Sequence, residues 1–139
     1  IEYGSVRSVG NPLSVLFSGG QLGADNGAGF GWKDISVVKL GATYAVDERL
    51  TLRAGASRAQ QPVPSSQTFF NILAPGVVRN HFSLGASYRL AGGELSAAYT
   101  RAPKVTVSGD GSIPAGFGGG EASNHLREDV LTVGYTWAL

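Results

Sequence analysis

Cysteine is absent from this chain of 139 residues, and charged residues are scarce. Without cysteine there can be no disulfide, no thiolate metal site and no cysteine nucleophile. Charged residues make up 15% of the chain, compared with about 25% in ordinary globular domains. No apolar run approaches the roughly 18 to 20 residues that a membrane-spanning helix needs, and the mean hydropathy is only +0.03. If the chain crosses a membrane, it must do so with strands.

The charges that are present do not gather into a functional face. The chain has 11 basic and 10 acidic residues, and its net charge is +1, so no basic surface indicates nucleic-acid binding. The two histidines, His81 and His125, lack the spacing of metal ligands. The glycine-rich stretch from Gly27 to Gly31 lacks the helix and the Lys-Ser/Thr pair of a phosphate-binding loop. We therefore expect no enzyme activity, no metal and no cofactor.

The last eight residues alternate strictly between large apolar and small or polar side chains. This period of two is typical of a transmembrane strand that faces lipid on one side and a lumen on the other. The apolar members are Val133, Tyr135, Trp137 and Leu139, and the others are Thr132, Gly134, Thr136 and Ala138. The ending also resembles the signal that the barrel-assembly machinery reads, with Thr132, Gly134, Trp137 and Leu139 in the signal positions.

About six segments of this kind recur along the chain with turn signals between them. In each segment one face is apolar and the other is rich in Gly, Ala, Ser and Thr. The predicted strands are Ile1 to Arg7, Val38 to Val46, Leu50 to Ser57, His81 to Leu90, about Leu95 to Tyr99, and about Glu128 to Leu139. The pattern predicts an all-β protein with antiparallel strands.

The connections between these strands alternate between long and short. The long ones run over about 10–31, 60–78 and 108–124, and the short ones are Asp47-Glu48 and 91–93. Long loops on one side and tight turns on the other are typical of a transmembrane β-barrel. The C-terminus then lies on the short-turn side, which is the periplasm, and the long loops face outside. A soluble sheet with alternating faces is the less favoured alternative.

Arg101 breaks the apolar face of the fifth strand. An arginine that faces lipid at mid-bilayer costs roughly 2 to 4 kcal/mol, and this cost falls towards zero near the interface. Pro103 follows almost directly, and proline within a sheet is typical of a bulge or an edge. We therefore expect a bulge or the end of the lipid-facing band here, with Arg101 at the membrane interface.

Three stretches together resemble the FadL/TodX-type family of outer-membrane transporters for long-chain fatty acids and other hydrophobic compounds. In order and spacing they cover nearly the whole chain, and the last of them is the most specific. They are 29–34 (GFGWKD) entering 39–44 (KLGATY), 50–55 (LTLRAG) running to 62–64 (PVP), and 71–78 (NILAPGVV).

The resemblance implies a fourteen-stranded barrel with an N-terminal hatch in its lumen. Residues 1–139 would be the C-terminal portion of that one barrel domain, with about six of its strands, and the hatch and the early strands would be absent. Six strands alone leave open edges, which cost several kcal/mol for each unpaired backbone group in hydrocarbon. We therefore expect the chain to be part of a longer protein in the outer membrane of a Gram-negative bacterium.

The implied function is passive transport, in which a hydrophobic ligand binds in the lumen and leaves sideways into the membrane. A fatty-acid carboxylate would need cations, and the candidates on the lumen face or its rim are Lys33, Lys39, Arg53, His81 and Arg89. Arg53 is the strongest of these because it lies in mid-strand. The alternative is that these cations pair with carboxylates such as Glu94.

Phe69 and Phe70 lie with Ile72 and Leu73 in an external loop, where exposed apolar side chains require an explanation. They meet the substrate or fold over the mouth of the barrel. Other expected partners are membrane lipid, lipopolysaccharide and the barrel-assembly machinery. Two functional alternatives stay open at this point: a structural or adhesive barrel without transport, and a soluble β-sheet binding module.

Overall fold

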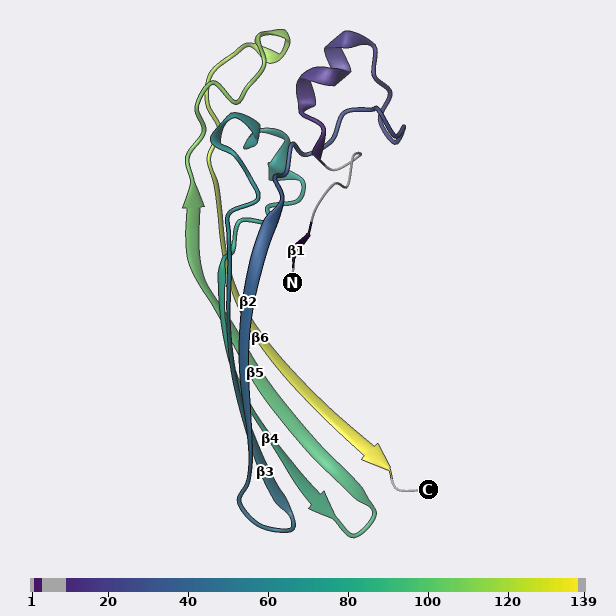
Figure 1. Cartoon of the computed structure of the whole chain (residues 1–139), viewed down its shortest axis with the longest axis vertical. Coiled ribbons are helices and arrows are strands. Elements are labelled where there is room, and N and C mark those ends of the chain that lie inside the picture. The colour runs from purple at the N-terminus through teal and green to yellow at the C-terminus, as the bar shows by residue number, and fades with distance from the viewer. Residues whose placement is uncertain (1, 4–9, 138–139) are drawn as a thin grey trace.

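The computed structural model describes residues 2–3 and 10–137, which form one open antiparallel sheet with its strands in chain order (Figure 1). Within these ranges no helix has the length and apolar character needed to cross a membrane. The strands are β1 (Glu2–Tyr3), β2 (Ile35–Ala45), β3 (Leu50–Ala59), β4 (Asn80–Leu90), β5 (Gly93–Val107) and β6 (Asn124–Trp137). The described part of the long connections contains four short 3-10 helices: η1 (Leu13–Ser18), η2 (Ser65–Gln67), η3 (Phe70–Ile72) and η4 (Ala115–Phe117).

The register of the sheet places the large apolar side chains of neighbouring strands on one shared face, which we call the outward face. Tyr44 lies opposite Leu52, and Leu52 lies opposite Ala86. Ala86 in turn lies opposite Ala97, and Ala97 opposite Val133. Because side chains alternate along a strand, residues such as Thr43, Arg53 and Thr132 lie on the opposite face, which we call the inner face. The two faces that the sequence predicted are therefore confirmed.

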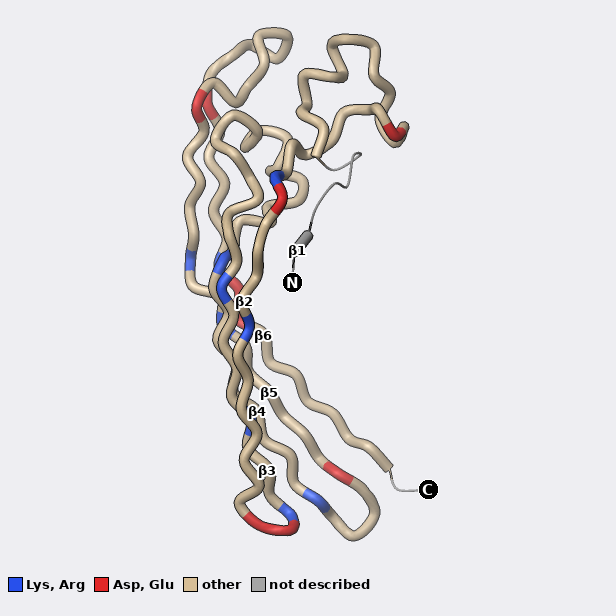
Figure 2. The backbone as a smooth tube through the Cα atoms, viewed as in Figure 1, with Lys and Arg blue, Asp and Glu red and all other residues tan. Residues whose placement is uncertain are grey.

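The outward face carries an apolar band of the height expected for an outer membrane. On β2 and the turn after it, five apolar residues alternate from Val38 to Val46. Eight residue steps of about 3.3 Å, tilted by about 40°, give a height of about 20 Å, close to the roughly 25 Å band of such barrels. Figure 2 shows few charged residues along the strands between the short turns and a charged zone midway up the molecule.

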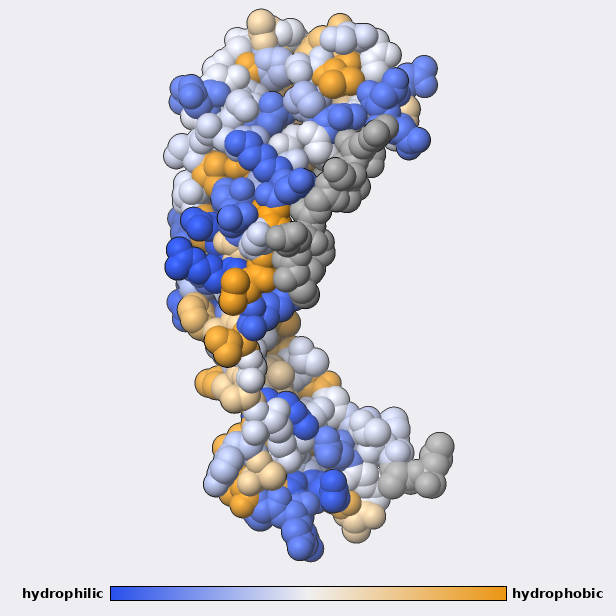
Figure 3. Space-filling view, in the orientation of Figure 1, coloured by the Kyte–Doolittle hydropathy of each residue, from blue (hydrophilic) through white to orange (hydrophobic). Residues whose placement is uncertain are grey.

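Polar residues replace apolar ones on the outward face above this band. They are Ser36 on β2, Arg58 on β3, Asn80 on β4, Arg101 on β5 and Asp129 on β6. In Figure 3, hydrophobic side chains gather around the narrow middle of the sheet, and hydrophilic ones crowd the region above it. The outward polar residues mark the upper border of the band, on the side of the long loops.

A bulge interrupts β5 directly above Arg101. Ala102 lies opposite Glu128, but the next pair is Val105 and Leu126, so Pro103 and Lys104 together face Arg127. Proline has no N–H to donate to the ladder, which explains why the irregularity falls at this point. The predicted bulge is confirmed, and Arg101 lies at the border of the apolar band rather than at its centre.

Local hydrogen bonds hold the first of the two short turns, between β2 and β3. In the β2–β3 turn, the Val46 N–H donates to the Leu50 carbonyl at 2.9 Å. The Asp47 carboxylate accepts from the N–H groups of Arg49 and Leu50 at 2.7 and 2.8 Å. These bonds, with that from Arg49 first, hold the pKa of Asp47 below its usual value of 3.8. Short turns therefore lie at one end of the sheet and the long connections at the other, as predicted.

Several predicted strand boundaries were wrong at the loop end. The sixth strand begins at Asn124 rather than about Glu128, and the fifth continues to Val107. β2 begins at Ile35 rather than Val38. Backbone pairing continues above the apolar band, where lipid no longer imposes alternation, so the sequence pattern stops before the strand does. Of the predicted first strand, Glu2–Tyr3 pairs with β2, and the remainder lies outside the described residues, as does Leu139.

Candidate functional site

Small side chains line most of the inner face and leave a hollow of about 390 Å³ across β3 to β6. Arg53 is the only charged residue in its lining. The other inner-face residues around the hollow are Gly55, Ser83, Gly85, Ser87, Ser96, Ala98, Thr100 and Thr132. Because none of these side chains is large, the sheet leaves space beside a single cation.

Arg53 extends along the inner face towards the short turns. Its Nη1 atom donates a hydrogen bond of 2.6 Å to the Ser87 hydroxyl on β4. Gly85, which lies directly opposite Arg53, has no side chain to obstruct the guanidinium. A guanidinium carries five N–H donors, and the bond to Ser87 uses one of them. The arrangement can therefore hold a carboxylate inside the hollow without breaking the contact that orients Arg53.

A second polar group lies higher on the inner face. His81 on β4 and Glu128 on β6 lie on either side of β5, where Glu128 is opposite Ala102, and their Nε2 and Oε2 atoms are 4.0 Å apart. Ala102 between them is 1% exposed, and a larger side chain there would separate the pair. Lys39 lies on the same row, opposite Ser57, which itself lies opposite His81. His81 thus has a carboxylate partner, as the alternative interpretation of the candidate cations expects.

Three long connections pack together into a unit that we call the loop cap, made of residues 10–34, 60–79 and 108–123 (Figure 1). Asn71, which is fully buried, holds the first two together. Its amide donates to the carbonyls of Phe30 and Gln67 at 2.8 and 2.7 Å. Its oxygen accepts a bond of 2.5 Å from the Trp32 indole. One side chain therefore joins segments that lie about 40 residues apart.

A second buried side chain, Thr68, joins the second connection of the cap to the third. Its hydroxyl donates to the carbonyl of Ala122 at 2.6 Å. The carbonyl of Thr68 accepts from the Asn124 amide, at the beginning of β6, at 2.8 Å. The buried apolar side chains of Val63 and Val77 lie in the same connection as Thr68. The cap therefore has a small core of its own.

Gly31 allows the first connection to pass close to the second. Its φ of +64° lies in the left-handed region, which residues other than glycine rarely adopt. A Cβ at this position would lie 2.5 Å from Cγ of Gln67. Gln67 in turn accepts a hydrogen bond from the Leu13 N–H at 3.1 Å. The glycine-rich stretch that ends at Gly31 therefore serves loop packing.

Phe69 and Phe70 are half-buried and contact different parts of the cap. The Phe70 ring stacks on Phe30 with centroids 5.1 Å apart. The Phe69 ring lies 5.6 Å from Phe117, which in turn lies 5.6 Å from Phe17. Phe17 and Phe117 are about half exposed, and so is Ile72, while Leu73 is 74% exposed. The cap therefore presents apolar side chains to the outside from all three connections.

The predicted cations do not form one site. Ser57 lies on the row that carries Lys39 and His81. Arg53 lies four residues from Ser57 along β3, a distance of about 13 Å at the rise of a strand. Lys33 belongs to the cap, where its N–H donates to Pro62, and its side chain is exposed. Arg89 lies opposite Glu94 beside the short turns. Among the candidate cations, Lys39 and His81 share one row of the wall, whereas Arg53, Arg89 and Lys33 each lie at another level.

Sequence reasoning missed three features of this region. They are the anchoring roles of Asn71 and Thr68, the pair of His81 with Glu128, and the aromatic residues Phe17 and Phe117. The parity of β6 placed Glu128 on the inner face, and this signal could have identified the partner of His81. Within residues 2–3 and 10–137 no group of three or more His, Asp or Glu side chains could hold a metal ion.

Comparison with known proteins identifies one family. Residues 16–112 match the model of the family described as outer membrane protein transport protein (OMPP1/FadL/TodX). This match covers well over half of the chain, from the loop cap through β2 to the tip of the last long connection. No curated protein and no solved structure shows a significant match to the chain.

Proposed function

The chain belongs to the OMPP1/FadL/TodX family of outer-membrane transport proteins, and we propose that it forms part of a channel for long-chain fatty acids or related hydrophobic compounds. Proteins of this family are β-barrels in the outer membrane of Gram-negative bacteria and transport hydrophobic compounds; they are not enzymes. This location excludes the soluble β-sheet module. Residues 1–139 would be the C-terminal portion of one fourteen-stranded barrel domain, with the hatch and the early strands in the rest of the protein.

One observation carries this proposal: the inner hollow holds a single cation among small side chains. A fatty acid is a long apolar chain with one carboxylate, and Arg53 beside about 390 Å³ of open space matches that chemistry. The hydrocarbon chain supplies the driving force, because each buried methylene contributes about 0.8 kcal/mol. The carboxylate at Arg53 would then fix the position of the ligand on the wall.

The loop cap supplies a first contact for the same ligand. Phe17, Phe117 and Leu73 expose apolar surface on the outer side of the barrel mouth, and larger exposed apolar patches mark interaction or ligand-binding sites. Phe69 supports Phe117 from within the cap. The ligand would pass from this surface to the hollow beside Arg53 and leave sideways into the membrane.

The test compares two arginines of one strand in the full-length protein in cells. Arg53→Gln removes the inner-face cation, and Arg58→Gln removes an outward-face cation above the apolar band. We expect Arg53→Gln to raise the half-saturating concentration for oleate uptake by about ten- to a hundredfold, the effect of losing one charged hydrogen bond. Uptake of a long-chain alcohol, which has no carboxylate, should stay unchanged, and Arg58→Gln should leave both unchanged.

Immunoblots of the outer-membrane fraction check that all variants are present at equal levels. Equal oleate uptake by the wild type and Arg53→Gln would remove Arg53 from ligand binding. If cells that contain the full-length protein took up no hydrophobic compound faster than cells without it, a structural or adhesive barrel would be the better description.

A further inference from the structure

The outward face carries a groove that the transport proposal does not use. Its volume is about 540 Å³, and it runs across β2 to β5. Three alanines, Ala42, Ala54 and Ala56, form a low floor between the larger Leu40, Phe82 and Leu84. Because these residues belong to the apolar band, the groove faces the lipid in the complete barrel wall. Its shape and its apolar lining suit a hydrocarbon chain.

One end of this groove is charged. Arg101 and Tyr99 on β5 complete its lining, and Arg101 lies opposite Phe82 on one side and Asp129 on the other. The groove therefore begins over the alanines, within the apolar band, and reaches the polar border at Arg101. An amphiphile with its chain on the alanines would place its headgroup at this border.

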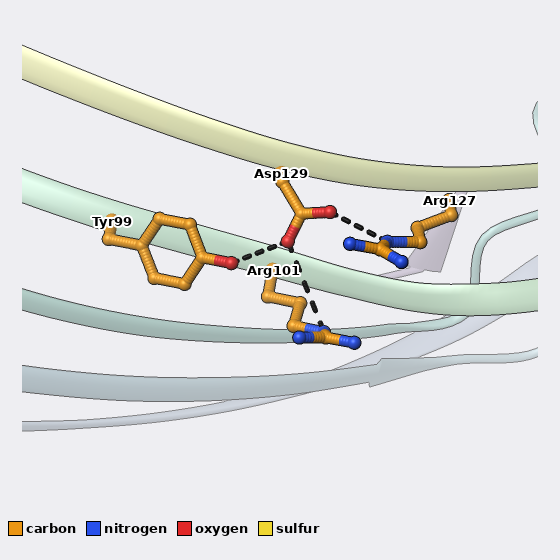
Figure 4. A network of polar contacts seen from close by, with 4 residues as sticks. All are labelled: Tyr99, Arg101, Arg127 and Asp129. Atoms are coloured by element: carbon orange, nitrogen blue, oxygen red, sulfur yellow. Dashed lines mark hydrogen bonds and ion pairs between the residues drawn. The ribbon is translucent and has the colours of Figure 1, made fainter.

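Two arginines meet around one carboxylate at that border (Figure 4). Asp129 accepts a hydrogen bond of 2.7 Å from Nε of Arg127, and its other oxygen lies 4.0 Å from Nε of Arg101. The Tyr99 hydroxyl donates to the same oxygen at 2.5 Å. The cluster therefore carries two positive charges and one negative charge, and both arginine side chains are about half exposed.

The two arginines have more N–H donors than the Asp129 carboxylate uses, and their geometry suits a phosphate. Both arginines approach Asp129 through Nε, and each guanidinium carries four further N–H donors on its Nη atoms. The fork of an arginine matches the oxygens of a phosphate, and two arginines with a net positive charge attract an anion. Asp129 and Tyr99 hold the two cations at a fixed spacing, which lowers the entropy lost when an anion binds.

The level of the cluster identifies the leaflet. It lies at the loop end of the apolar band, which is the outer border of the membrane because the long loops face outside. The outer leaflet of this membrane is built from lipopolysaccharide, a lipid with phosphate groups and several acyl chains. We propose that the outward face binds such a phosphorylated, multi-acyl lipid, with a phosphate at Arg101 and Arg127 and an acyl chain in the alanine-floored groove.

Native mass spectrometry of the purified full-length protein in detergent tests this proposal. The probe is diphosphoryl lipid A. The variants are the double variant Arg101→Gln with Arg127→Gln, the variant Ala56→Phe, and Arg49→Gln, a control that removes one positive charge at the opposite border. We expect the double variant to bind lipid A about tenfold more weakly or worse, because two charged contacts are lost. Ala56→Phe, which fills the groove, should weaken the binding of lipid A several-fold, and Arg49→Gln should bind lipid A as the wild type does.

Two further probes separate the sources of phosphate. Dephosphorylated lipid A should bind weakly to the wild type and equally to the double variant. Inorganic phosphate in millimolar excess should compete poorly, because it has no acyl chain. The heat-modifiable gel mobility of each variant verifies that its barrel is folded.

Three results would overturn the assignment. Equal binding of lipid A by the wild type and the double variant would remove the arginines from the site. Phosphatidylglycerol that binds as tightly as lipid A, with the same dependence on the arginines, would assign the site to a glycerophospholipid instead. Binding that Ala56→Phe leaves unchanged would remove the groove from the proposal.

Discussion

The loop cap and the sheet below it are built from the same small and weakly charged residues, but they keep those residues in place differently. In the cap, Asn71 and Thr68 are fully buried and bind the backbone of neighbouring connections. In the sheet, large apolar side chains such as Leu40 and Leu131 are more than 70% exposed, and the backbone ladder joins the strands. The cap therefore has an interior of its own, whereas the apolar side chains of the sheet require lipid.

This difference means that the two regions should fail under different perturbations. A charge on the outward face should affect the sheet through the membrane, and loss of a buried polar side chain should affect the cap alone. Two substitutions test this separation, and a third tests how a turn of the sheet is held; they follow in order of decreasing effect.

The largest effect is expected from Leu84→Arg, which places a charge in the apolar band. The cost should be about 2 to 4 kcal/mol in the free energy of unfolding, less if the position lies near the interface. The measurement is urea unfolding of the full-length protein in phospholipid vesicles. Ser83→Arg is the matched control, because the neighbouring side chain lies on the inner face, and it should cost much less. Equal costs for the two variants would mean that the outward face does not contact lipid.

Asn71→Ala should have the next largest effect, confined to the cap. The substitution leaves the Trp32 indole and two backbone carbonyls without their partner, and an unsatisfied buried group costs about 1 to 3 kcal/mol. Hydrogen exchange of the folded protein should become faster in residues 10–34 and 60–79, while the amides of β2 to β6 keep their protection.

The neighbouring Ile72→Ala serves as the control for Asn71→Ala, because Ile72 is 55% exposed. It should leave exchange in the cap nearly unchanged. If Asn71→Ala accelerated exchange in the strands as strongly as in the cap, the two regions would form one cooperative unit.

The smallest effect concerns Asp47 in the β2–β3 turn. Hydrogen bonds from Arg49 and Leu50 lower the pKa of Asp47 in the folded protein. Its carboxylate therefore stabilises the turn at pH values above the ordinary pKa of 3.8. This contribution is lost as the pH falls through the lower folded-state pKa. The stability difference between the wild type and Asp47→Ala should therefore be present at neutral pH and be lost as the pH falls below the folded-state pKa. Glu48→Ala removes an equal charge from the same turn, and a matching pH profile for both variants would contradict the role of the hydrogen bonds.

The sequence predicted most of the sheet but little of the cap. Alternation with a period of two identified β2, β3, β4 and the membrane part of β5 and β6, because lipid on one side requires large apolar residues at every second position. The same reasoning placed Arg53 on the inner face. It stopped short of Asn124 and Val107, where the strands leave the membrane and the requirement ends.

The cap follows no period, so its contacts could not be predicted. Asn71 and Phe30 lie 41 residues apart in the sequence, and Thr68 and Ala122 lie 54 apart. Nothing in the local sequence specifies which connection a polar side chain of the cap will bind. Phe69 and Phe70 are neighbours in the sequence, yet Phe70 packs against the first connection and Phe69 against the third.

The bulge at Pro103 and Lys104 shifts the alternation of side chains along β5 by one residue. Below it the odd-numbered residues face outward, as Tyr99 and Arg101 do, but above it Val105 lies opposite Leu126 of the inner face. Val105 and Val107 are thereby turned inward beneath the loops, with Thr106 on the outward side. If β5 instead continued past Arg101 in unbroken alternation with both residues kept, Val105 and Val107 would turn outward. The length of this short segment, as much as its composition, decides which side of the wall the end of the strand faces.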